Sequence, residues 1–146
     1  MNEERIKKVA AIVTREGRAA TEVLVFDHPL EEGGLMTQIP AGTVEPNEPP
    51  DVAAVRELLE ETGVRGQLVA LAGVRDEERE GEKRRRWVFL LRGPEGLLDE
   101  WPFTCDCGVP TRCHWLPLDQ AEIVAHQQPW LELARSWVRA SGADRL

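Results

Sequence analysis

The spacing of hydrophobic residues along this chain follows two patterns, one typical of strands and one typical of helices. Runs rich in Val, Ile, Leu and Phe, bounded by Gly, Pro or charged clusters, predict strands or extended segments. These runs cover residues 5–15, 22–27, 36–40, 66–75, 83–92 and 112–116. Helical spacing appears at residues 51–62 and 129–141, and a further helix is expected to begin within 117–126. Strands mixed with two or three helices indicate an α/β sandwich, in which helices flank a sheet.

The helix predicted at residues 51–62 carries signals at both of its ends. Pro49 and Pro50 precede it, and proline suits the first turn of a helix but not its interior. Asp51 is expected to be the N-cap, because its carboxylate can accept from the free N–H groups of the first turn. Gly63 is expected to end the helix in the left-handed conformation.

The two sides of this helix differ in character. The apolar side is expected to hold Val52, Val55, Leu58, Leu59 and Thr62. Glu57, Glu60 and Glu61 are expected on the other side, where like charges at these spacings repel. Two of these acids also lie in the last turn, where the helix dipole favours cations. A bound Mg²⁺ or Mn²⁺ would remove both costs, whereas the alternative is a solvated charged face in which Arg56 pairs with Glu60.

Two segments show neither pattern. Residues 76–82 are mostly charged and predict a turn between two strands. Residues 93–111 are rich in Gly, Pro and acids, and they predict an irregular loop. A loop of this length inside one domain usually has a function.

The loop before the acidic helix decides between the two interpretations of its charged side. Gly42 is followed by five residues and then Glu48, and seven more residues lead to Arg56. The remaining fixed positions are Glu57, Leu58, Glu60, Glu61, Gly63 and Val64. This spacing resembles the box of the Nudix hydrolase family, G-x5-E-x7-R-E-U-x-E-E-x-G-U with U aliphatic, and it matches at every fixed position. Such a match is far more specific than a short glycine motif.

The resemblance implies a fold, a reaction and a set of residues. The fold is a Nudix-type α/β/α sandwich, with a mixed β-sheet between helices. The reaction is metal-dependent hydrolysis of a phosphoanhydride, with Mg²⁺ or Mn²⁺ as cofactor. The implied catalytic and metal-binding residues are Glu57, Glu60 and Glu61, with the backbone carbonyl of Ala41 or Gly42 as a further ligand and Arg56 beside them. Gly42, Glu48, Arg56 and Gly63 are the structural residues of the box, and Glu48 is expected to pair with Arg56.

Substrate and general base lie outside the box. The expected substrate is a nucleoside diphosphate linked to another moiety, such as a nucleoside triphosphate, a nucleotide sugar or ADP-ribose. The amino-acid sequence of residues 39–46 is similar to that of family members that act on nucleotide sugars and nucleoside phosphates. Candidate substrate-binding residues are Arg75, Arg84, Arg86 and Trp101. The general base remains open among Glu95, Asp99 and Glu100.

Other interpretations of the chain stay open. One is a non-catalytic, nucleotide-sensing Nudix-like binding module, which would be expected to lack a box glutamate. Another is an interaction protein whose acidic helix is only solvated. Cys105, Cys107, Cys113 and His114 could bind zinc, but their spacing is unusual for a zinc site and free thiols are favoured.

Composition bounds the remaining properties. The 146 residues suit a single domain spanning 1–146. The net charge of −8 argues against stable nucleic-acid binding. No apolar run approaches the roughly 18 residues of a membrane span, and no secretory signal is visible at the start. An odd number of cysteines without framework spacing predicts a cytoplasmic protein, and a homodimer remains open.

Overall fold

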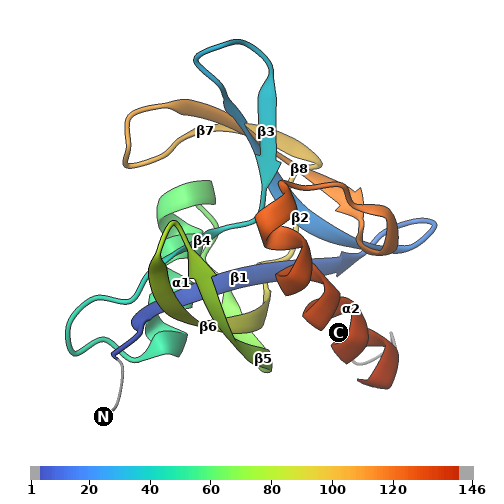
Figure 1. Ribbon diagram of the computed structural model, residues 1–146. Helices are drawn as coiled ribbons and strands as arrows, with labels where there is room; N and C mark the ends of the chain where they lie inside the picture. The colour runs from blue at the N-terminus through green and yellow to red at the C-terminus, as the bar shows by residue number, and fades with distance from the viewer. Residues whose placement is uncertain (1–3, 142–146) are drawn as a thin grey trace.

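The computed structural model describes residues 4–141, and its elements alternate between strands and helices (Figure 1). The strands are β1 (Ile6–Glu16), β2 (Thr21–Pro29), β3 (Leu35–Gln38), β4 (Ala41–Thr43), β5 (Gln67–Arg79), β6 (Glu82–Arg92), β7 (Glu100–Thr104) and β8 (Pro110–Pro117). The helices are α1 (Pro50–Thr62) and α2 (Gln128–Ser141), with short 3-10 turns η1 (Leu118–Gln120) and η2 (Ala125–Gln127). Neither α1 nor α2 has the length and apolar character that crossing a membrane requires.

Strand β1 organises the sheet. The order of strands is β5-β6-β1-β2-β8-β7, with β3 paired to β2 and β4 paired to β1. The pairing of β1 with β6 is parallel, whereas β1 pairs antiparallel with β2 and β4. Strand β4 therefore covers the first half of β1 on the side away from β6, and β2 covers its last residues. The expected mixed sheet is confirmed.

Alternating side chains of β1 supply both hydrophobic cores. Val9, Ala11 and Val13 pack in the cluster that contains the buried residues of α1. Ala10 and Ile12 point to the opposite face and pack in the cluster that contains α2. Because both faces are covered, the central strand is apolar without interruption. The arrangement is a helix–sheet–helix sandwich, as the sequence predicted.

Three segments differ from their predicted structure. Residues 76–82 are not a wide turn, because β5 and β6 continue to a tight hairpin at Glu80 and Gly81, supported by pairs such as Asp76 with Arg85. Residues 93–111 are not irregular throughout, since β7 forms along the edge of β8. The region 117–126 contains no α-helix but the turn η1 and the start of η2.

Helix α1 also differs in its start and in its buried face. Pro49 is the N-cap, and Asp51 lies inside the first turn, so the predicted cap is wrong. The end at Gly63 is confirmed, with φ of 79°. The buried residues are Ala53, Ala54, Leu58 and Thr62, while Val52 is 51% exposed. Two small alanines let the helix approach β1 closely, and this rotates the buried stripe away from the valine side.

Candidate functional site

The rotation of α1 places two box glutamates against the sheet instead of in solvent. With 3.6 residues per turn, Glu57 and Glu61 fall within the stripe that begins at Ala53 and Ala54. Both side chains are half-buried, so the predicted separation into one apolar and one acidic side is wrong. Glu60 lies at the border of this stripe.

Strand β4 receives these two carboxylates. The backbone N–H of Ala41 donates to Glu61 Oε1 at 3.0 Å. A Cβ added to Gly42 would lie 2.1 Å from Glu57 Cδ, so glycine is needed here for the close approach of the carboxylate. The position of Ala41 beside Glu61 agrees with the expected role of its carbonyl as a ligand, which remains a prediction.

Arg56 joins the box loop to the helix. Its Nε and Nη2 donate to the two carboxylate oxygens of Glu48 at 2.8 and 2.9 Å, and Nη2 also donates to the Thr43 carbonyl at 2.9 Å. Its Nη1 donates to Glu57 Oε1 at 2.9 Å and to Glu60 Oε1 at 2.8 Å. The predicted Glu48–Arg56 pair is present, and the Arg56–Glu60 pair exists alongside it. Hydrogen bonds from Arg56 lower the pKa of Glu48 to about 2.

The electrostatics of Glu57 and Glu61 are those of a crowded acidic pair. Burial is the main cause that raises the pKa of Glu61 to about 9, and the nearby charges of Glu57 and Asp106 act in the same direction. Burial also raises the pKa of Glu57, although its hydrogen bond from Arg56 opposes the change. Two buried carboxylates that share one site resist ionisation together. A cation placed between them would stabilise both charges.

The carboxylates fit a hard divalent cation in their chemistry. Oxygen donors are the ligands that Mg²⁺ and Mn²⁺ prefer, and Glu61 has only one backbone donor, Ala41, to offset its charge. Within residues 4–141, no three Asp, Glu, His or Cys groups are already arranged to hold an ion. Glu57 and Glu60 instead turn toward Arg56, which neutralises them in this structure. Metal binding would therefore require these two side chains to turn away from Arg56.

The candidate substrate residues lie in different environments. Arg86 is 3% exposed, and it donates to Glu77 and to the Val9 carbonyl, so its guanidinium is held by the fold. Arg84 and Arg75 are more accessible and face the same side of the sheet, where each is near an acid. Trp101 donates from Nε1 to the Thr62 carbonyl at 2.9 Å and packs against the end of α1.

The acids proposed as general base do not lie at this site. Asp99 pairs with Arg15 near the far end of β1, and Glu100 pairs with Arg112. Glu95 is exposed in the loop after β6. The acid outside the box whose charge acts on Glu61 is Asp106, in the turn between β7 and β8. The sequence did not indicate it, because a turn that follows an unpredicted strand cannot be placed.

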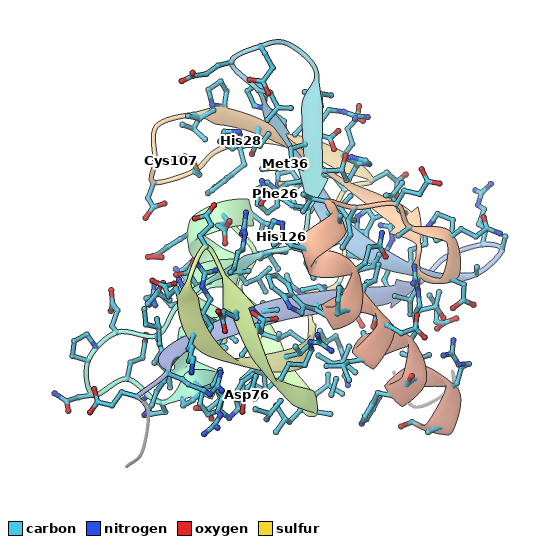
Figure 2. All side chains as sticks on the ribbon, in the orientation of Figure 1. Phe26, His28, Met36, Asp76, Cys107 and His126 are labelled. Carbon is cyan, nitrogen blue, oxygen red and sulfur yellow. A yellow bond between two sulfur atoms is a disulfide. The ribbon has the colours of Figure 1, made fainter. Side chains whose placement is uncertain are left out.

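The cysteines and His114 do not form a zinc site. The sulfurs of Cys105 and Cys107 are bonded to each other, so the expectation of free thiols is wrong for this pair. Cys113 is a free, fully buried thiol on β8. His114 Nε2 lies 2.9 Å from Asp27 Oδ2. Figure 2 shows Cys107 in the turn between β7 and β8, whereas Cys113 lies within β8.

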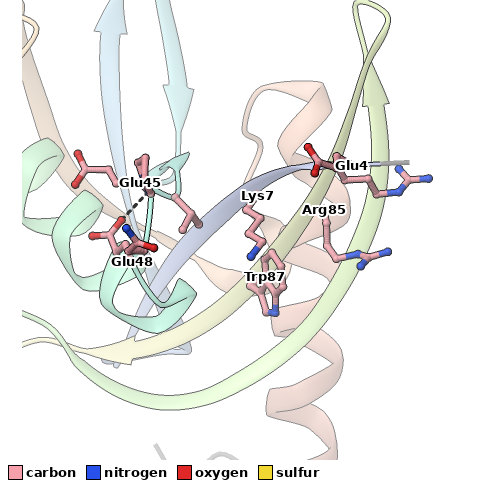
Figure 3. Close-up of a pocket in the computed structure, with 10 residues that line it drawn as sticks. Glu4, Lys7, Glu45, Glu48, Arg85 and Trp87 are labelled. Atoms are coloured by element: carbon pink, nitrogen blue, oxygen red, sulfur yellow. Dashed lines mark hydrogen bonds between the residues drawn. The ribbon is translucent and has the colours of Figure 1, made fainter. Parts of the chain in front are cut away.

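A large hollow lies beside the box loop on the same face of the sheet as α1 (Figure 3). This cavity of about 750 Å³ is lined by Lys7, Arg85 and Trp87 and by loop residues such as Glu48. Glu57, Glu60 and Glu61 do not line it. We therefore locate the candidate site by its paired carboxylates and not by the size of a hollow.

Comparisons with known proteins agree with this geometry. The profile of the NUDIX domain matches residues 4–137. Diphosphoinositol polyphosphate phosphohydrolase 3-alpha of Mus musculus is 41% identical over 118 residues, which are 81% of this chain and 68% of that protein. Diphosphoinositol polyphosphate phosphohydrolase 3-beta of Homo sapiens is 39% identical over 118 residues, which are 81% of this chain and 68% of that protein.

Solved structures share the fold. A NUDIX hydrolase from Nitrosomonas europaea superposes with a TM-score of 0.71 at 21% identity, covering 91% of this chain and 90% of that one. The C. elegans Ap4A hydrolase superposes with a TM-score of 0.65 at 18% identity, covering 95% and 100%. With the complete box, its two carboxylates held on β4 and a domain profile that spans nearly all of the described residues, this chain belongs to the Nudix family of hydrolases.

Proposed function

We propose that this protein is a Mg²⁺- or Mn²⁺-dependent hydrolase that cleaves a diphosphate bond, with Glu57, Glu60 and Glu61 as its metal ligands. Glu57 and Glu61 are the main ligands in this proposal. The observation that supports it most is the half-buried Glu57–Glu61 pair against β4, which has too few donors to hold two negative charges. A divalent cation supplies charge neutralisation at phosphoryl oxygens and a nucleophilic water at phosphorus.

The other box residues have positioning roles in this proposal. Arg56 holds Glu48 and the Thr43 carbonyl, and it therefore fixes the loop that ends β4. Gly42 leaves space for Glu57, and Ala41 orients Glu61 through its N–H. Asp106 is our candidate for the residue that orients or deprotonates the attacking water, because its charge already acts on Glu61.

Two substrate classes are supported by different observations. A diphosphoinositol polyphosphate comes first, because the mouse and human relatives at 41% and 39% identity carry that activity in their names. A nucleoside diphosphate linked to another moiety, such as a nucleoside triphosphate, a nucleotide sugar or ADP-ribose, comes second. The sequence of residues 39–46 supports this second class, because it is similar to that of nucleotide-sugar and nucleoside-phosphate relatives.

A hydrolysis screen tests the proposal. Purified protein is incubated with members of both classes and with a dinucleoside tetraphosphate, with Mg²⁺, Mn²⁺ or a chelator, and the products are resolved by mass. We expect cleavage at a diphosphate bond that the chelator abolishes. Glu61→Gln should reduce turnover by about 100-fold or more, because it removes a ligand charge that the transition state needs.

The control is Glu31→Gln, which makes the same charge change at an exposed position between β2 and β3. Its turnover should equal that of the wild type, and thermal melts should show that both variants are folded. Wild-type turnover in Glu61→Gln would refute the assignment of the metal site. Ligand binding without turnover of any substrate in the wild type would instead support the nucleotide-sensing module.

A further inference from the structure

A group of basic side chains lies on the face of β1, β6 and β5 that is turned toward α2. Residues that pair directly across strands project to the same face of a sheet. Thr43 pairs with Lys8, Lys8 pairs with Arg86, and Arg86 pairs with Arg75, so these residues form one row across four strands. The next pairs along the hairpin add Arg84 and Arg79 to the same face. We name Lys8, Arg75, Arg79, Arg84 and Arg86 the basic row.

The basic row begins next to the box carboxylates. Thr43 follows Gly42, against which Glu57 packs, and Lys8 Nζ donates to Thr43 Oγ1 at 2.6 Å. Burial lowers the pKa of Lys8, and the charges of Arg84 and Arg86 also lower it, while Glu57 raises it. The contact between Lys8 and Thr43 places the start of the row on the strand that carries Gly42, while the row itself lies on the sheet face turned toward α2.

The far end of the basic row lines a cavity. This cavity of about 370 Å³ is bounded by His126 and Trp130 from η2 and α2 and by charged residues of the hairpin, which are Arg75, Asp76, Glu77, Glu78, Arg79, Arg84 and Arg86. Burial and the charges of Arg79, Arg86 and Arg84 lower the pKa of His126. Arg79, Arg84 and Arg86 line this cavity together with His126, which lies close to the start of α2 (Figure 2).

The cations of the row are not all used by the fold. Arg86 is held by Glu77 and lies 3.8 Å from the ring centre of Trp130, so it forms the floor of the cavity. Arg84 has one acidic partner, Glu82, and the side chain of Arg79 makes no hydrogen bond or ion pair within residues 4–141. The Nε of Arg75 is buried there without a hydrogen-bond partner. Four arginines line the cavity against the three acids Asp76, Glu77 and Glu78, on a protein of net charge −8.

We propose that the basic row is a second anion-binding subsite, which takes a phosphate group of the substrate that is not part of the scissile diphosphate. Arg79 and Arg84 bind this phosphate in the cavity between the hairpin and the start of α2. The inference rests on the proposed function, because it assumes that the scissile bond lies at Glu57 and Glu61. It makes a second phosphate on the substrate a determinant of specificity.

A binding experiment separates the subsite from the chemistry. Inositol hexakisphosphate and inorganic tripolyphosphate serve as probes in titration calorimetry with chelator present, so that divalent cations at the carboxylates do not contribute. Arg79→Gln and Arg84→Gln should each weaken binding about tenfold, which corresponds to loss of one charge-assisted hydrogen bond. Arg85→Gln is the matched control, because Arg85 is the neighbour of Arg84 on the opposite face, where it binds Asp76.

The outcomes distinguish the two proposals. Weaker binding in Arg79→Gln and Arg84→Gln but not in Arg85→Gln supports the subsite, even if no substrate has been found. Equal losses in all three variants, or none, overturn it while leaving the hydrolase proposal intact. With a hydrolysed substrate in hand, the same two variants should raise KM about tenfold for a substrate with a second phosphate and leave KM unchanged for one without it. Unchanged KM for both substrates also overturns the subsite.

Discussion

Arg56 fixes the positions of several neighbours at once, and this dense bonding follows from the shape of its side chain. A guanidinium offers five N–H donors in a planar fork, and here they reach Glu48, Glu57, Glu60 and the Thr43 carbonyl. The family resemblance implies the pair with Glu48, and the pair with Glu60 is the alternative to metal binding at the acidic side of the helix. The sequence could not predict that both bonds form together, because this depends on the path of the loop from residue 43 to 48.

Replacing Arg56 by Ala should mainly destabilise the loop against the helix. The substitution leaves the half-buried Glu48 with only the Glu45 N–H as a donor within residues 4–141 and removes the bond to the Thr43 carbonyl, so we expect a loss of about 2 kcal/mol in the free energy of unfolding. Urea denaturation of variant and wild type measures this loss. Mg²⁺ should still raise the melting temperature of the variant. A variant with full stability that no longer responds to Mg²⁺ would contradict this division of roles.

At the scale of elements, spacing predicted the regular segments and failed where packing decides. The long strands and both α-helices follow from apolar runs and helical spacing, and Gly63 correctly marks the end of α1. The sequence did not predict the short strand β7, because it is an edge strand that contains Pro102 and forms by pairing with β8. The buried face of α1 was missed because Ala53 and Ala54 pack by their small size, which a pattern of large apolar residues does not register.

The same limit applies to the candidate site. The box motif identified Glu57 and Glu61 through its spacing, but their burial depends on the rotation of α1 over β4. Asp106 and Lys8 reach the site only through tertiary structure, from a turn and from the first strand. No short-range pattern connects these residues to the box.

Replacing the two glycines of the box by Ala should have different effects, one on turnover and one on stability. Gly42→Ala places a Cβ 2.1 Å from Glu57 Cδ, so we expect loss of turnover and a smaller rise in melting temperature with Mg²⁺. Gly63→Ala strains a residue with φ of 79° and brings a Cβ within 2.8 Å of Phe103 Cε1. This should cost about 1–2 kcal/mol of stability by the ordinary penalty for such sites.

Activity assays and urea denaturation on both variants separate the two effects. Each variant is the control for the other, since both add one methyl group within the box. The Gly63→Ala protein should keep near-normal turnover below its unfolding transition. If Gly42→Ala kept normal turnover and Mg²⁺ response, the contact between β4 and Glu57 would not position the metal site.

At the scale of the whole molecule, charge is distributed unevenly around the site. The protein carries a net charge of −8, and its box holds a concentrated share of that charge. Arginines gather on the sheet face of β5 and β6 that is turned toward α2. An anionic substrate is repelled by the net charge at long range, so local cations such as Arg79 and Arg84 must attract it. A divalent cation at the carboxylates would extend the attractive region to the scissile bond.

The ionisation of Glu61 gives the whole protein a pH dependence that a divalent cation should reverse. Its pKa is raised from 4.5 to about 9 in the folded chain, so the folded state holds a proton that the unfolded state releases in this window. The free energy of unfolding should therefore fall as pH rises between these values when a chelator is present. Binding of Mg²⁺ needs the ionised carboxylate, so its stabilising effect should grow over the same window.

Thermal melts across this pH window, with chelator and with Mg²⁺ at matched ionic strength, test both trends in one experiment. The melting temperature in chelator should decrease with pH, and the difference made by Mg²⁺ should increase. Glu61→Gln carries a neutral side chain at every pH, so both trends should become shallower in this variant, whereas Glu31→Gln should behave as the wild type. An Mg²⁺ effect of constant size, with the same slopes in wild type and Glu61→Gln, would mean that the cation binds elsewhere. The buried carboxylate would then have to be a neutral structural group, and the link between burial of Glu61 and catalysis would be lost.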